Sequence, residues 1–172
     1  MGLDMYLTGK RYIWRDERDK IRITGLPVKH EVKSVDYDMG TWRKANAIHK
    51  WFVDNVQDGE DNCAQYGVSR EKLQDLYQAV TKVLESSELV EGVIVNGYTI
   101  GDGGKRIANK EVGRVMENVS VAKELLPTEE GFFFGSTDYN EWYYRDLETT
   151  KRLLADALSS DKEIDFYYES SW

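Results

Sequence analysis

Apolar and polar residues alternate at the start of the chain, where Leu3, Met5 and Leu7 are separated by more polar neighbours. A period of two is typical of a strand with one buried face. Residues 12–14 either extend this strand or form a second short one. The apolar positions within 32–37 predict a further strand.

The apolar spacing then changes to three and four residues, which places the apolar side chains on one face of a helix. The residues that share this face are Ala45, Ile48, Phe52 and Val56. We expect Thr41 to cap the N-terminus of this helix, because its hydroxyl can accept a hydrogen bond from an unpaired amide. The helix is expected to end near Asp58 and Gly59.

Two further helices carry clear start signals. Ser69 is expected to cap the first of them, with Glu71 in a first turn where a negative charge suits the helix dipole. Asp138 is expected to cap the second, with Glu141 three residues later completing a capping box. Helical spacing predicts the inward faces of the two helices: Leu73, Leu76, Val80, Val83 and Leu84, then Tyr143, Leu147, Leu154 and Leu158.

The segment 92–113 is rich in glycine, holding six of the 14 glycines of the chain. It predicts an inserted hairpin or mobile loop. Residues 115–126 are expected to be helical, 131–135 to form a buried strand or extended segment, and 166–168 to form a closing strand. Strands and helices mix without a regular βαβ rhythm. The pattern therefore predicts a single α+β domain over 1–172, with a small mixed or antiparallel sheet and about three main helices.

Composition and charge narrow the functional classes. The chain has 172 residues, 41% of them hydrophobic, and a formal net charge of −8. Such an acidic chain repels a phosphate backbone, which argues against direct nucleic-acid binding. Cys63 is the single cysteine, which fits a reducing cytoplasm. The sequence contains no apolar run long enough for a membrane span and no pattern of a signal peptide, so we expect a cytoplasmic protein.

Several long motifs resemble a family of small uncharacterised proteins of bacteriophages and prophages. The resemblance rests on the opening MGLDMYL, the block WRKANAIHKWFVDNV at 42–56, LPT at 126–128, GFFFGSTDYNEWYY at 131–144, and the terminal FYYESSW. It covers most of the chain, and the segment 92–113 departs from it. The resemblance implies a phage accessory protein in the cytoplasm of the bacterial host. It implies no reaction for any residue.

His49 is the sharper candidate of the two histidines. On the predicted helix, Trp42, Asn46 and His49 share a stripe beside the apolar one. An imidazole there could act as a general base or hydrogen-bond a ligand. The alternative is a structural histidine that packs on Trp42 and bonds to a neighbouring group.

Other motifs fit known chemistry poorly. A Cys63–His49 thiolate–imidazole pair is conceivable, but a small residue buried in a connector is the simpler interpretation. One cysteine and two separated histidines do not make a zinc ligand set, and we expect neither a metal nor a cofactor. Residues 101–106 fail the phosphate-loop pattern. As a hairpin tip, they could still contact an acidic partner through Lys105 and Arg106.

The turn before the helix that Asp138 is expected to cap is the best candidate for a ligand site. Glycine permits close approach of the backbone, hydroxyls follow, and the helix N-terminus supplies amides that can hold an anion. Two aromatic residues could then stack on a base or clamp a peptide. The alternative is that the polar residues only cap the helix and the aromatic ones fill the core. The candidate residues are Gly135, Ser136, Thr137, Asp138, Tyr139 and Trp142.

Three functions remain open at this point. The first is a non-enzymatic binder of a host or defence-system protein, or of a small anionic ligand. The second is a small hydrolase of a nucleotide or nucleic acid that uses His49 with nearby carboxylates and the turn at 136–138. The third is a structural or assembly protein that self-associates through exposed aromatic residues.

Overall fold

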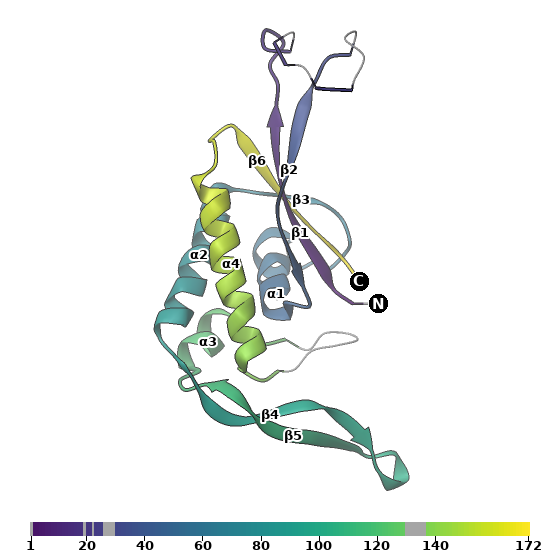
Figure 1. The fold of residues 1–172 in the computed structure, drawn as a ribbon, viewed down its shortest axis with the longest axis vertical. Coiled ribbons are helices and arrows are strands. Elements are labelled where there is room, and N and C mark those ends of the chain that lie inside the picture. The colour runs from purple at the N-terminus through teal and green to yellow at the C-terminus, as the bar shows by residue number, and fades with distance from the viewer. Residues whose placement is uncertain (1, 19, 22, 26–29, 130–136) are drawn as a thin grey trace.

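The computed structural model describes residues 2–18, 20–21, 23–25, 30–129 and 137–172, and Figure 1 shows how their helices and strands are arranged. The predicted α+β class is confirmed. The elements in chain order are β1 (Asp4–Tyr12), β2 (Ser34–Arg43), α1 (Asn46–Val56), β3 (Tyr66–Val68), α2 (Arg70–Glu85), β4 (Leu89–Ile100), a 3-10 turn η1 (Asp102–Gly104), β5 (Arg106–Met116), α3 (Ser120–Leu125), α4 (Glu141–Ser159) and β6 (Ile164–Ser171).

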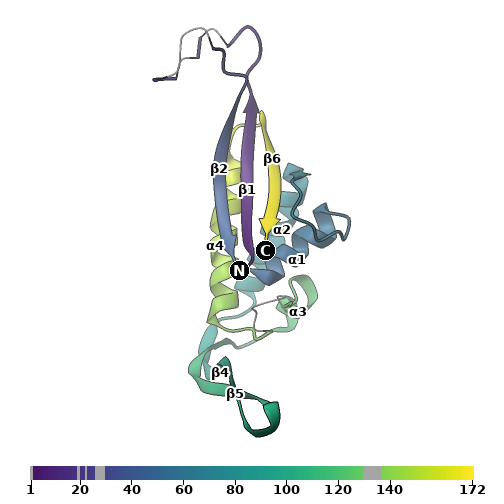
Figure 2. The same cartoon turned by 90° about the vertical axis from the view of Figure 1, so that its right-hand side faces the viewer.

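A four-stranded antiparallel sheet forms the body, in the order β2-β1-β6-β3. Alternation sets its buried face: Met5 and Leu7 of β1 are fully buried, as is Tyr168 of β6. These side chains pack against α1, α2 and α4 in one hydrophobic cluster. The helices cover one face of the sheet, and the strands lie in front of them in Figure 2. The opposite face of the sheet, which we call the open face, has no helix on it among the described residues.

Strands β4 and β5 form a separate two-stranded ribbon, which we call the arm. It confirms the predicted hairpin and extends it at both ends, from Leu89 to Met116. Figures 1 and 2 both show the arm projecting from the end of the body where α4 begins. Two backbone contacts fix the base of the arm to the start of α4. They are a β-bridge between Val115 and Asn140 and a hydrogen bond from Met116 N to Tyr139 O (2.9 Å).

Helical spacing identified the inward faces correctly, but three predicted boundaries were wrong. Thr41 does not cap α1, because β2 continues pairing with β1 as far as Arg43. Ala45 holds the cap position without a capping side chain. The predicted helix over 115–126 begins only at Ser120, since Val115 and Met116 belong to β5. In both cases, residues that the local pattern assigned to a helix form their backbone hydrogen bonds with a neighbouring strand instead.

The third error concerns α4, which Asn140 caps in place of Asp138. The Asn140 Oδ1 atom accepts hydrogen bonds from Trp142 N (3.0 Å) and Tyr143 N (3.3 Å). Glu141 is consequently the first helical residue, so no capping box forms with Asp138. By contrast, Ser69 caps α2 as predicted, accepting from Lys72 N at 3.2 Å. The predicted segment 131–135 lies outside the described residues.

Replacing Asn140 with Ala should lower the free energy of unfolding by about 1–2 kcal/mol, since one buried and one partly buried amide lose their acceptor. Asn140→Asp keeps the acceptor and should stay close to wild type. Ser69→Ala, which removes a single bond at an exposed cap, should cost less than Asn140→Ala. Urea unfolding measures all three variants. Equal midpoints for Asn140→Ala and wild type would contradict the assigned cap.

Candidate functional site

A cavity of about 210 Å³ lies between the starts of α1 and α4. Its floor is buried and largely apolar, and its rim is exposed and polar. That volume is equivalent to about seven molecules of liquid water, which suits a ligand the size of a nucleobase or an amino acid. The residues that line it are Lys44, Ala45, Asn46, Ala47, Ile48, Thr128, Glu129, Asp138, Asn140, Trp142, Tyr143, Asp146 and Leu147.

The chain enters α1 through an unusual backbone at Lys44. Its φ of 61° is in the left-handed region, which non-glycine residues seldom adopt. The Lys44 amide donates to Leu3 O (2.8 Å), which holds the turn against β1. The described residues supply no capping side chain to α1, and its first turn has no acidic residue. The positive end of the α1 dipole therefore lies at the cavity.

Asp146 is a strongly perturbed ionisable group of the cavity. It lies one turn after Trp142 on α4, beside the buried Tyr143 and Leu147. Burial raises the pKa of its carboxyl from 3.8 to about 7. A carboxyl poised near neutral pH at the wall of a cavity is a feature of functional sites.

The charges around the cavity are mainly negative. Glu129, Asp138 and Asp146 contribute carboxyl groups, while Lys44 is the one basic residue among the described lining residues. Two helix N-termini add about half a positive charge each. Above pH 7, where Asp146 is ionised, these positive charges do not fully offset the three carboxylates. The cavity therefore favours cations and N–H donors over anions.

Three of the predicted ligand residues meet in this cavity: Asn46, Asp138 and Trp142. Asn46 spans part of it, with its Nδ2 atom 3.5 Å from Glu129 O. The Trp142 ring is 58% exposed and has the Arg145 guanidinium 5.1 Å from its centroid. Thr137 is exposed, and its carbonyl accepts from Thr128 Oγ1 (3.0 Å).

The other predicted residues that the structure describes do not line the cavity. Tyr139 packs edge-on against Tyr143, and its hydroxyl accepts from Thr128 N (3.3 Å). Trp42 was predicted to share a helical stripe with Asn46 and His49, which is wrong because it belongs to β2. It is buried, and its Nε1 atom donates to Thr150 Oγ1 at 2.9 Å. Gly135 and Ser136 lie outside the described residues.

Sequence reasoning missed Lys44 and Asp146. Asp146 follows Trp142 by four residues and Tyr143 by three, so it falls between two lining side chains of the same helix face. A polar residue within an apolar stripe was the available signal. Lys44 gave no signal, because its contribution comes from a backbone turn that only the junction of β2 with α1 creates.

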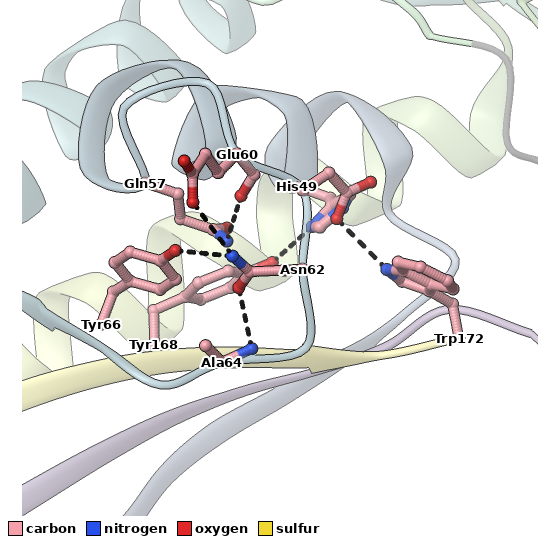
Figure 3. A network of polar contacts seen from close by, with 9 residues as sticks. His49, Gln57, Glu60, Asn62, Ala64, Tyr66, Tyr168 and Trp172 are labelled. Atoms are coloured by element: carbon pink, nitrogen blue, oxygen red, sulfur yellow. Dashed lines mark hydrogen bonds and ion pairs between the residues drawn. The ribbon is translucent and has the colours of Figure 1, made fainter.

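His49 is held in a partly buried polar network between α1, the loop that follows it and the C-terminal strand (Figure 3). Its Nδ1 atom lies 2.8 Å from the Tyr168 hydroxyl, and its Nε2 atom 3.1 Å from Asp61 Oδ1. The carboxylate requires a donor, which assigns the N–H to Nε2 and leaves Nδ1 to accept the Tyr168 proton. Trp172 Nε1 also donates to Asp61 Oδ1 (3.2 Å).

This network joins the loop after α1 to the C-terminal strand. Tyr168 is fully buried and stacks on Phe52 with ring centroids 3.9 Å apart and an interplanar angle of 7°. Burial, with a smaller effect from the charge of Asp61, raises the pKa of Tyr168 above its usual value. Both nitrogens of the His49 ring have partners inside the protein. The geometry therefore fits the structural alternative for His49 better than general-base catalysis.

The remaining candidates are exposed. Cys63 is exposed rather than buried as expected, because the connector over 61–65 lies on the surface. Lys105 and Arg106 are exposed at the tip of the arm, with Arg106 5.4 Å from the Tyr98 ring centroid. Across the described ranges, no cluster of three His, Cys, Asp or Glu residues could hold a metal ion. No helix of the described chain combines the length and apolar character needed to cross a bilayer.

Tyr168→Phe tests the structural role of the His49 network. The variant keeps the ring stacked on Phe52 but leaves the buried Nδ1 atom of His49 without a donor, so unfolding should become easier by about 1–3 kcal/mol. Tyr66→Phe is the matched control: its hydroxyl contacts Asn62 (2.9 Å) at a less buried position, and its removal should cost less. Urea denaturation would reject this role if the two variants were equally stable.

The raised pKa of Asp146 predicts a specific pH dependence of stability. The folded protein keeps this proton up to about pH 7, whereas the unfolded chain releases it near 3.8. The contribution of Asp146 is therefore greatest below pH 3.8 and is lost as the pH rises to about 7. Asp146→Asn should remove that loss, and Glu148→Gln, exposed on the same helix, should retain it. Urea unfolding at several pH values between 3.8 and about 7 gives the free energy of unfolding of each variant. If that free energy changed with pH in the same way for wild type and Asp146→Asn, the raised pKa of Asp146 would be contradicted.

Comparison with known proteins returned no family model, no curated protein and no solved structure that matches this chain.

Proposed function

We propose that the protein is a non-enzymatic binder that holds a small nitrogenous ligand in the cavity between α1 and α4. The observation that carries the proposal is the desolvated carboxyl of Asp146 in a cavity of about 210 Å³. A desolvated carboxyl without a basic partner among the described residues is costly, and ligand N–H groups would relieve that cost. The ligand class is therefore one with two adjacent N–H donors, as in a guanidinium group or the guanine base.

Each part of the cavity has a role in this proposal. Asp146 faces the N–H donors of the ligand, since an ionised carboxylate accepts two parallel hydrogen bonds from a guanidinium group or from the N1–H and N2–H edge of guanine. Trp142 provides an exposed ring on which a planar group can stack. The apolar floor, including Ile48 and Leu147, excludes water from these contacts. This ligand differs from the anion expected from the sequence, because the negative charge of the three carboxyl groups exceeds the positive charge of Lys44 and the two helix N-termini.

The sequence resemblance supports the location of the site. Lys44 to Ile48, Thr128, and Asp138 to Tyr143 belong to three of the blocks that resemble phage and prophage proteins. These blocks are distant in the sequence and converge on the cavity. An accessory protein that sequesters a small metabolite in the host cytoplasm is consistent with that resemblance. A hydrolase that uses His49 receives less support, since its ring is occupied by Tyr168 and Asp61.

Titration calorimetry with agmatine, adenosine, guanosine and cytidine tests the proposal at pH 8, where Asp146 is ionised. At least one compound should bind, and Asp146→Asn should weaken that binding about tenfold or more, since a charged hydrogen bond is lost. Glu148→Gln is the matched control and should bind as wild type does. If the ligand is cationic, affinity should fall as the pH drops below 7, because Asp146 takes up a proton.

Two results would count against this function. The first is that none of the four compounds binds to the folded wild-type protein. The second is that a compound binds with the same affinity to wild type and to Asp146→Asn, which would place its site elsewhere.

A further inference from the structure

The arm carries an apolar surface that the body does not cover. Val93 and Val112 are cross-strand partners that are 64% and 72% exposed, and Ile100, at 78%, is the most exposed large apolar residue of the described chain. The register places these residues on one side of the ribbon together with Tyr98. A two-stranded ribbon gains little stability by itself, and exposed apolar residues in such a pattern mark an interaction surface.

The arm is also basic relative to the rest of the chain. Residues 89–116 contain four basic residues (Lys105, Arg106, Lys110, Arg114) and three acidic ones (Glu91, Asp102, Glu111), a net charge of +1. The whole chain carries −8, so the remainder carries −9. Arg106 and Lys110 lie on the same side of the ribbon as Val93, Val112 and Ile100. The partner of this side should therefore combine apolar groups with negative charge.

The open face of the sheet has the complementary chemistry. Its register brings Tyr6 and Tyr12 of β1 together with Asp36 and Asp38 of β2 and with Asp165, Tyr167 and Glu169 of β6. Tyr6 and Tyr12 are 36% and 51% exposed, and the half-buried Tyr167 lies on the same face. Asp36 forms a long ion pair with Lys10 (3.8 Å), and acidic side chains outnumber basic ones on the described part of this face.

We propose that the arm of one copy docks on the open face of a second copy. Both surfaces are exposed among the described residues, and the arm projects away from the body, so the two do not meet within the described part of one molecule (Figures 1 and 2). Arg106 and Lys110 would lie against Asp36 and Asp165, with the arm's valines against the tyrosines. Two such contacts related by a two-fold axis, each placing the arm of one copy on the open face of the other, close a dimer. This inference does not depend on the cavity or its ligand.

Sedimentation velocity of the full chain tests the proposal. Wild type should shift from a monomer of 19.9 kDa at about 10 µM toward a dimer at about 200 µM. Raising the salt from about 50 mM to about 500 mM should weaken association, since the pairs are at the surface. A monomer at every concentration in low salt would overturn the proposal.

Charge exchange identifies the two surfaces. Arg106→Glu with Lys110→Glu should weaken association about tenfold or more, and adding Asp36→Lys with Asp165→Lys should restore it. Arg152→Glu with Lys162→Glu makes the same charge change at exposed positions on the body and should leave association unchanged. Val93→Thr with Val112→Thr preserves the shape of the ribbon and should also weaken association.

The pattern of rescue distinguishes this contact from others. If the arm variant weakens association and the exchange on the sheet does not restore it, the arm binds a different surface, and the proposed pairing is wrong. If the body control weakens association as much as the arm variant does, only net charge matters, and the proposal is equally overturned. Circular dichroism of each variant confirms that the fold is retained.

Discussion

The structure depends on how Asn140 satisfies the start of α4. Its side chain accepts from two amides of the first turn, and its backbone forms a bridge with Val115 at the base of the arm. The residue is 3% exposed and also lines the cavity. A buried helix end must satisfy its amides inside the protein. One residue therefore caps the longest helix of the described chain, ties it to the base of the arm and forms part of one wall of the candidate site.

The cavity exists because two helices begin at the same place without filling the space between them. The α1 helix starts from the strained turn at Lys44, and α4 starts from the cap at Asn140. Helix ends cannot pack as closely as helix faces, because their backbone groups need polar partners. The result is a polar-rimmed hollow with a desolvated carboxyl, Asp146, in its wall. In contrast, the His49 ring is engaged by Tyr168 and Asp61, and this network ties the C-terminal strand to α1.

Charge and apolar surface are distributed unevenly over the molecule. One face of the sheet is closed by helices, while the other presents tyrosines and carboxylates to solvent. The arm has exposed valines and isoleucines beside basic residues. An isolated ribbon cannot bury both of its faces, so one side of the arm stays exposed unless another molecule covers it. The overall charge of −8 conceals this division between arm and body.

The sequence by itself determined which faces of the strands and helices are buried, because periods of 2 and 3.6 depend only on local backbone geometry. It therefore predicted the α+β class, the core of α2 and α4, and the arm. Only the tertiary structure decided where the helices begin. Thr41 and Trp42 pair with β1, so α1 starts after them. At the start of α4, the backbone bridge to the arm is made by Asn140, which is the cap in place of Asp138. The tertiary structure also separated His49 from the cavity and gave Asp146 its raised pKa. Burial and desolvation arise from segments far apart in the chain, and no local pattern encodes them.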